Sequence, residues 1–246
     1  MKSVRIYRSE SSGLRLVSFT VKVKETDLWV ALSSDAYSPD LPSRIERLVF
    51  NRRVLLEQYL AEYPHLKTAL APGLAEGNPP ELFRVMTAAA NRAGVGPMAA
   101  VAGAIAEEVG LYLQDLAEEV IIENGGDVFV KALQPINVGL YTGNSPLSSR
   151  LAVKIRPEQT PLGVCTSSGT IGPSLSFGRA DAAVALSPST ALADAAATAL
   201  GNRVEKAGDL EPALEYARNV EGITGALLVL QDKMAAWGDI ELVRTS

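Results

Sequence analysis

The stretch Asn124-Gly125-Gly126-Asp127 separates two short apolar runs, Val120-Ile121-Ile122 and Val128-Phe129-Val130. Such runs predict strands, and the paired glycines predict a tight turn between them. Glycine permits positive φ and a close approach of backbone to ligand, and exposed amides can hold an anionic oxygen. The turn is therefore either one wall of a ligand site, oriented by Asn124 and Asp127, or a plain turn whose side chains bond their own backbone. From spacing alone, the plain turn is the more common situation.

Hydrophobic patterning on both sides of this turn predicts an α+β fold with mixed or antiparallel sheets. Residues 1–36 alternate apolar and polar positions, which is typical of antiparallel strands. Apolar residues recur at helical spacing in 42–63, 81–93 and 98–116. After the turn, the pattern predicts strands at 137–141, 151–155, 226–230 and 240–243 and helices at 191–200 and 209–218. The predicted helix at 98–116 leads into a strand and Gly-Gly-Asp, and residues 178–181 lead into Val184 and the alanine-rich helix; this weak similarity suggests an internal duplication.

The composition is that of a globular protein, with 246 residues of which 47% are hydrophobic and 21% charged. The net charge of -5 lacks the basic surface that binds phosphate backbones, so we expect no nucleic-acid partner. No apolar run approaches the roughly 18 residues of a membrane span. Residues 1–8 carry charges where a signal peptide needs an apolar stretch. We therefore expect a cytoplasmic protein without a membrane anchor, with residues 1–246 in one α+β domain or two intimate lobes.

A second candidate segment is rich in small hydroxyls: Thr166, Ser167 and Ser168 precede Gly169 after an apolar strand end. Hydroxyls and a glycine suit the oxygens of phosphate or ribose, and a plain Ser/Thr loop is an equally good interpretation. Cys165 is the only cysteine and His65 the only histidine, and they are distant in sequence. We therefore interpret Cys165 as a buried apolar residue and not as a nucleophile.

Asp194 and Thr198 lie four residues apart on the alanine-rich helix, so they project from one face and can converge on one point. A carboxylate and a hydroxyl, completed by carbonyl, phosphate or water oxygens, form a shell that Mg²⁺ accepts. The alternative is an aspartate that only complements the dipole at a helix start.

Three weaker features complete the set of candidates. Residues 94–97, Gly-Val-Gly-Pro, precede a helix whose N-terminus can bind phosphate, or they serve close helix packing together with Gly103. Arg179 and Lys131 are candidate phosphate partners. The acidic residues around the predicted helix at 98–116 are interpreted as a solvated face: Glu107, Glu108, Asp115, Glu118 and Glu119.

Taken in order, these segments resemble the ApbE-like superfamily, whose best-known members are Mg²⁺-dependent FAD:protein FMN transferases. Asn124-Gly125-Gly126-Asp127 is similar to the Gly-Gly-Asp turn of that family, and residues 155–169 resemble its strand leading to Thr-Ser-Gly. Residues 193–200 resemble its metal-binding helix, and residues 223–229 resemble its ending. The resemblance covers roughly residues 90–243. It implies an ApbE-like fold, Mg²⁺ at Asp194 and Thr198, and FAD as ligand or substrate.

Two motifs of the transferases are absent from this chain. Ala102-Gly103 and Glu107 stand where the transferases usually carry Lys-Gly and an aspartate. Residues 172–179 stand where they carry a His-Ile-Asp-Pro-x-Thr-Gly segment. Because that segment holds a group able to act as acid or base, its loss weakens the case for transfer more than the case for binding. The resemblance is therefore to a divergent branch of the superfamily.

Three functions follow for a small-molecule nucleotide ligand. The leading hypothesis is a Mg²⁺-dependent enzyme that cleaves the FAD pyrophosphate or transfers FMN, with Asn124 to Asp127, Thr166 to Gly169 and Arg179 around the nucleotide. The second is a non-catalytic flavin or nucleotide binding protein of the same fold, and the third is a scaffold that has lost the site. The sequence leaves the catalytic residues and the oligomeric state open, with a homodimer as one arrangement.

Overall fold

A computed structural model describes residues 15–140, 142, 145, 151–168 and 178–244. Its main feature is an eight-stranded sheet with the strand order β1-β2-β3-β4-β7-β8-β9-β10, in which all neighbours are antiparallel. The strand expected at residues 1–8 lies outside the described residues. The strands of this sheet are β1 (Leu16–Val23), β2 (Thr26–Ser33), β3 (Val120–Asn124), β4 (Asp127–Lys131), β7 (Leu162–Ser167), β8 (Ala182–Ser187), β9 (Gly225–Leu230) and β10 (Lys233–Gly238).

A smaller antiparallel sheet of three strands has the order β11-β6-β5. Its strands are β5 (Ile136–Gly139), β6 (Leu151–Ile155) and β11 (Leu242–Arg244). The helices are α2 (Leu41–Glu62), α3 (Pro64–Thr68), α4 (Glu81–Ala93), α5 (Val101–Gln114), α6 (Thr190–Gly201) and α7 (Leu210–Arg218). Short 3-10 turns are η1 (Ser34–Ala36), η2 (Pro97–Ala100), η3 (Pro157–Gln159) and η4 (Ala207–Asp209).

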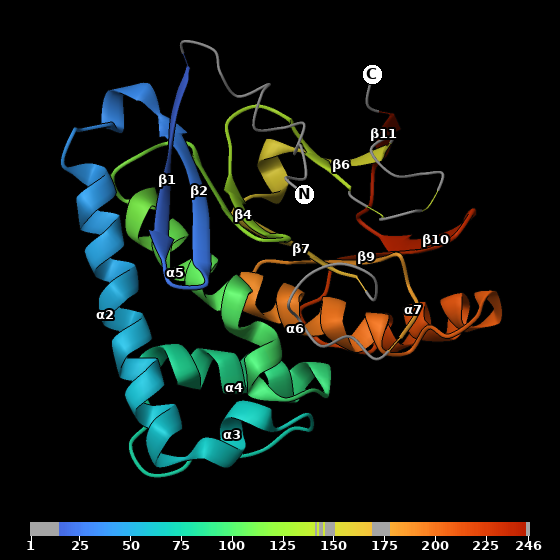
Figure 1. Cartoon of the computed structure of the whole chain (residues 1–246). Coiled ribbons are helices and arrows are strands. Elements are labelled where there is room, and N and C mark those ends of the chain that lie inside the picture. The colour runs from blue at the N-terminus through green and yellow to red at the C-terminus, as the bar shows by residue number, and fades with distance from the viewer. Residues whose placement is uncertain (1–14, 141, 143–144, 146–150, 169–177, 245–246) are drawn as a thin grey trace.

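The two faces of the large sheet are buried in different ways. Helices gather on one face, where α5 and α6 pack directly on the central strands (Figure 1). Their core contains Phe83, Met86 and Phe129, all almost fully buried. On the opposite face, side chains such as Val164 and Val184 pack with Ile155 of the small sheet. The central strands are therefore covered on both sides, which explains why β3, β4 and β8 read as continuous apolar runs.

The α+β prediction with antiparallel sheets is confirmed. The helices at 42–63, 81–93, 191–200 and 209–218 are found within one or two residues of their predicted ends. The helix expected at 98–116 is divided into η2 and α5, and β10 was missed. Strand β10 is a mostly exposed edge strand, Lys-Met-Ala-Ala-Trp-Gly, whose two alanines and closing glycine interrupt the apolar–polar alternation that predicts a strand. The duplication stays a prediction, and α5 precedes β3 whereas α6 follows β8.

The glycines of residues 94–97 have structural roles. Gly94 ends α4 in the left-handed region, with φ of 68°. A Cβ at Gly96 would lie 1.7 Å from the carbonyl oxygen of Ala69, so only glycine fits there. Of the two interpretations of this segment, close packing is the one that the contacts support.

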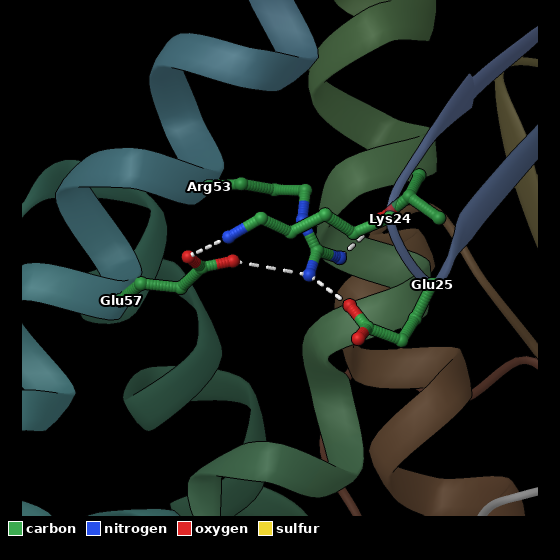
Figure 2. Close-up of polar contacts among 5 residues, drawn as sticks. Lys24, Glu25, Arg53 and Glu57 are labelled. Atoms are coloured by element: carbon green, nitrogen blue, oxygen red, sulfur yellow. Dashed lines mark hydrogen bonds and ion pairs between the residues drawn. The ribbon is translucent and has the colours of Figure 1, made fainter.

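Charged side chains fasten the β1–β2 hairpin to α2 (Figure 2). The guanidinium of Arg53 on α2 pairs with Glu25 at the hairpin turn, and it pairs with Glu57 at 3.2 Å. It also donates to the hydroxyl of Thr26 at 2.7 Å, and Lys24 pairs with Glu57. One set of these side chains comes from the β1–β2 turn and the other from α2. The network therefore holds β1 and β2 against the helical layer.

Among the described residues, no single helix is long and apolar enough to span a membrane. One bent pair, Glu81–Ala93 with Pro97–Gln114, passes that test by length and composition only. Most apolar side chains of these two helices belong to the core described above.

Helices α5 and α6 approach each other most closely at Gly103. A Cβ there would lie 2.5 Å from the carbonyl oxygen of Thr190 and 2.7 Å from Cβ of Asp194. Both distances are shorter than real Cβ contacts, so a side chain at this position would force the helices apart. The packing expected for Gly103 from the sequence is confirmed.

We expect Gly103→Ala to lower the free energy of unfolding by about 1–3 kcal/mol, the usual cost of overpacking a close contact. The matched control is Gly208→Ala in η4, where an added Cβ meets nothing within 4 Å. That variant should change stability by no more than about 0.5 kcal/mol. Urea unfolding measures both values, and equal stabilities of the two variants would contradict the close contact.

Candidate functional site

The segment Asn124-Gly125-Gly126-Asp127 forms the two-residue turn of the β3–β4 hairpin, because Asn124 and Asp127 are paired across it. Gly125 has φ of 75° and Gly126 approaches β7, where an added Cβ would lie 2.8 Å from the carbonyl oxygen of Thr166. The amide of Thr166 donates to the carbonyl of Gly126 at 3.1 Å. The predicted turn is confirmed, and it lies beside the hydroxyl segment that the sequence singled out.

Three polar side chains lie in one row across the sheet. Asn124 is paired with Asp127, which in turn is paired with Cys165 on β7. Residues paired in this way project from the same face, and for Cys165 that face is the one covered by helices. Asn124 and Asp127 are each only 8% exposed. The Nδ2 group of Asn124 donates to the carbonyl oxygen of Ala102 at 3.1 Å, which ties the row to the start of α5.

Asp194 on the first turns of α6 meets this row from the helical layer. Its Oδ2 accepts from the amide of Gly103 at 2.8 Å, and the amide of Ala102 also donates to its carboxylate. Desolvation raises the pKa of Asp194 well above its ordinary value, and the charge of Asp127 raises this pKa further. Asp127 and Asp194, from distant segments of the chain, are thus close enough for the charge of Asp127 to disfavour the charge of Asp194.

Cys165 is fully buried, is paired with Asp127 across the sheet, and lies close enough to Asp194 to be affected by its charge. Burial and the charges of Asp127 and Asp194 raise the pKa of its thiol well above the ordinary value. Its Sγ contacts the carbonyl oxygen of Thr190 at 3.4 Å. A neutral buried thiol is a poor nucleophile, which agrees with the interpretation of Cys165 as a core residue.

Hydroxyl groups are available on the same side. Thr198 lies one turn after Asp194 on α6 and is 9% exposed. Ser167 is the second residue after Cys165 on β7, so both project toward the helical face, against which α6 packs. The Oγ of Ser167 and the Oγ1 of Thr190 are buried and have no hydrogen-bond partner among the described residues. An unsatisfied buried hydroxyl costs free energy, and a bound oxygen-rich ligand near Ser167 would remove that cost.

Of the other predicted site residues, some lie beside the glycine turn and others do not. Thr166 and Ser168 flank Ser167 and are partly exposed, whereas Gly169 lies outside the described residues. Arg179 lies at the other end of α6, where its amide donates to the carbonyl of Val204 at 2.7 Å. Its exposed guanidinium pairs with Glu205 at 3.7 Å. The structure therefore does not bring Arg179 together with Asp194.

Lys131 is also engaged elsewhere than at the turn. Its Nζ donates to the carbonyl oxygens of Gln114 at 2.9 Å and Ala117 at 3.0 Å, at the C-terminal end of α5. A cation at this position satisfies carbonyls that the helix leaves free and complements the negative end of its dipole. Lys131 is therefore a helix cap, and its interpretation as a phosphate partner is wrong.

The interpretation of the acidic residues as one solvated face is wrong for two of them. Glu119 is 3% exposed, and its carboxylate pairs with Arg15 and accepts from the amide of Leu133 at 3.0 Å. Glu107 is half-buried and its Oε2 accepts from the amide of Ala191 at 2.8 Å and from the hydroxyl of Ser189 at 3.1 Å. Desolvation raises the pKa of Glu107, and these hydrogen bonds oppose the change. Glu107 follows Gly103 by four residues, and that spacing on the contact face was the available signal.

The chemistry of these groups fits a hard cation better than a thiolate or imidazole metal site. Within residues 15–140, 142, 145, 151–168 and 178–244, no three His, Cys, Asp or Glu side chains are arranged to hold a metal. Asp194 instead has a hydroxyl oxygen of Thr198 on its own helix face. No described Lys or Arg forms an ion pair with Asp194, so a cation would offset a charge that burial makes costly.

We expect Asp194→Asn to be more stable than the natural protein at pH 7. As the pH rises above 3.8, the unfolded chain loses the proton of this residue before the folded chain does, so ionisation favours unfolding. Asparagine keeps an acceptor for Gly103 without that cost. A gain of about 1 kcal/mol would raise Tm by about 2–4 °C, and the difference should vanish below the ordinary pKa of aspartate. A lower Tm than the natural protein at pH 7 would contradict the desolvation of this carboxylate.

Two relatives are similar in sequence over most of the chain. A UPF0280 protein of Methanocella arvoryzae is 40% identical over 218 residues, covering 88% of this chain and 86% of that protein. A UPF0280 protein of Methanocaldococcus jannaschii is 38% identical over 230 residues, covering 91% of both.

Two solved structures share the fold at low identity. The ApbE protein of Thermotoga maritima has a TM-score of 0.56 at 12% identity, covering 89% of this chain and 96% of that one. The H257G mutant of the flavin transferase ApbE from Vibrio cholerae has a TM-score of 0.54 at 14% identity, covering 91% and 97%. The model of the family AbpE bacteria matches residues 8–241. The chain therefore belongs to this family, as a divergent branch with the ApbE-like α+β fold.

Proposed function

We propose that this protein is a cytosolic enzyme that acts on the pyrophosphate of a flavin nucleotide such as FAD with the help of Mg²⁺. The observation that carries the proposal is the convergence of Asp127 and Asp194 beside the glycine turn. The two carboxylates come from segments that are far apart in sequence, the glycine turn and α6, and the charge of Asp127 disfavours the charge of Asp194. Structures that keep such a cost commonly do so at a functional site.

In this proposal Asp194 and Thr198 hold the cation. A carboxylate and a hydroxyl from one helix face supply hard oxygen ligands, which is the donor type that Mg²⁺ prefers. When bound, Mg²⁺ offsets the negative charge of phosphate oxygens. The carboxylate of Asp194 accepts from the amides of Gly103 and Ala102, and the oxygen lone pairs that these two bonds leave free would face the cation.

The nucleotide would lie against the exposed edge formed by the turn and the end of β7. Gly125 and Gly126 are exposed and leave backbone amides accessible, as a phosphate or ribose oxygen requires. The hydroxyls of Thr166, Ser167 and Ser168, followed by Gly169, would bind the same groups. Asn124 and Asp127 would orient the ligand.

Arg179 remains a proposal for a nucleotide contact, though its position at the far end of α6 does not favour it. Helix α6 has 12 residues, so its ends are separated by about 16 Å at 1.5 Å per residue. A dinucleotide spans that distance only in an extended form. The guanidinium of Arg179 is 78% exposed and therefore accessible to a ligand.

Flavin is the proposed ligand because the solved relatives with the same fold include a flavin transferase. We propose for this chain the flavin ligand of that transferase, and we propose no acceptor. Because residues 172–177 lie outside the description, the group that serves as acid or base is not assigned.

A second candidate, a non-catalytic flavin-binding protein, is favoured by the position of the sole histidine. His65 lies on α3, is 61% exposed and contacts Glu76 at 2.7 Å. It is therefore on a surface helix and not beside the glycine turn. Purified protein that retains a yellow chromophore and releases no product would support binding without turnover.

We expect purified protein incubated with FAD and Mg²⁺ to release AMP, measured by chromatography of the nucleotides. Asp194→Ala should lower the rate by about 100-fold or more, because the cation site loses its carboxylate. The control is Asp115→Ala, an exposed acid at the opposite end of α5. Its rate should match that of the natural protein. The same rate in Asp194→Ala would contradict the proposal.

A further inference from the structure

Near the point where α5 and α6 approach most closely, each helix has an acidic side chain that contacts the other helix. Gly103 and Glu107 are one turn apart on α5, and Ala191 and Asp194 are nearly one turn apart on α6. Asp194 accepts from the amide of Gly103 near the start of α5 at 2.8 Å. Glu107 accepts from the amide of Ala191 near the start of α6 at 2.8 Å. Each helix thus supplies a carboxylate to the N-terminal amides of the other.

Glu107 and Ser189 share the capping of α6. Ser189 already serves as the N-cap, since its Oγ accepts from the amide of Leu192 at 3.3 Å. The amide of Ser189 is itself satisfied by the hydroxyl of Ser187 at 3.1 Å. Glu107 accepts from the amides of Ala191 and Thr190, which the side chain of Ser189 does not satisfy, so a half-buried carboxylate of α5 completes the N-terminus of α6.

What Glu107 adds is a bond between the two helices. Its hydrogen bonds to Ala191 and Ser189 fix where the first turn of α6 lies relative to α5. Asp194 lies three residues after Ala191 on the same helix. The position of its carboxylate therefore depends on where the first turn of α6 lies relative to α5. A slip of α6 by a fraction of a turn would move Asp194 away from Gly103 and away from Asp127.

We infer that Glu107 is a positioning residue that holds Asp194 and Thr198 in register with the glycine turn, and so sets the affinity of this site for a divalent cation. The inference rests on the proposed cation site and goes beyond it by assigning an outer residue that does not touch the ligand. Residues that orient metal ligands in this way typically change metal affinity by about 10–100-fold when they are removed.

The test measures binding of Mn²⁺, used in place of Mg²⁺, by electron paramagnetic resonance of the free ion without added nucleotide. Glu107→Met keeps the length of the side chain and removes the acceptor, and Glu107→Ala removes both. We expect both variants to weaken Mn²⁺ binding by about 10-fold or more. Glu107→Gln keeps an oxygen acceptor for Ala191 and should stay within about threefold of the natural protein.

Two controls separate positioning from stability and from net charge. Asp209→Ala removes the acceptor for the amides of Glu205 and Lys206 next to α7, so it lowers Tm without touching the site. Glu108→Gln removes a neighbouring charge of α5 that pairs with Arg52 at the surface. Both controls should bind Mn²⁺ as the natural protein does.

Each outcome decides between the proposals. If Glu107→Met and Glu107→Ala lower Tm but keep the Mn²⁺ affinity, Glu107 is only a cap and the inference is wrong. If Glu107→Gln weakens binding as much as Glu107→Met, charge and not position is responsible, and the inference is again wrong. If the natural protein and Asp194→Ala bind Mn²⁺ equally, the cation site itself is wrong and the role of Glu107 falls with it.

Discussion

The contact between α5 and α6 at Gly103 is the constraint on which the rest of the site depends. Because no side chain separates the helices there, the carboxylates of Asp194 and Glu107 each reach the N-terminal amides of the opposite helix. Helix N-termini attract negative charge, so both contacts are favourable to the backbone even though burial raises the pKa of both acids. The pair of contacts fixes α6 over β7 and places Asp194 beside Asp127. A wider crossing would remove both contacts together.

The same arrangement lowers the stability of the folded protein. Burial, together with the charges of Asp127 and Asp194, raises the pKa of the thiol of Cys165, and burial together with the charge of Asp127 raises the pKa of Asp194. The Oγ of Ser167 is buried without a partner among the described residues. In the function proposed above, a bound cation would offset this repulsion and an oxygen-rich ligand would satisfy the hydroxyl. Stability and binding therefore oppose each other at Asp194.

Much of the fold could be predicted from the sequence, because local patterns determine it. The glycine pair with flanking apolar runs predicts the β3–β4 hairpin, and the spacing of alanines, Asp194 and Thr198 predicts one face of α6. The roles of Glu107 and Lys131 could not be predicted in this way, since both depend on which helix end lies opposite. Strand β10 is a mostly exposed edge strand that contacts α7, and its central alanines and closing glycine give its sequence little β-signal. For Arg179, nearness in sequence to the hydroxyl segment did not place it beside Asp194.

The most direct test of a cation site at Asp194 and Thr198 is a crystal structure grown with Mn²⁺ and ADP, with data collected at the manganese absorption edge. The account predicts an anomalous peak at direct coordination distance, about 2.1 Å, from a carboxylate oxygen of Asp194 and the hydroxyl of Thr198. The phosphates of ADP should lie toward Gly125 and Gly126. A peak at another place, or a nucleotide bound without any ion near Asp194, would contradict it.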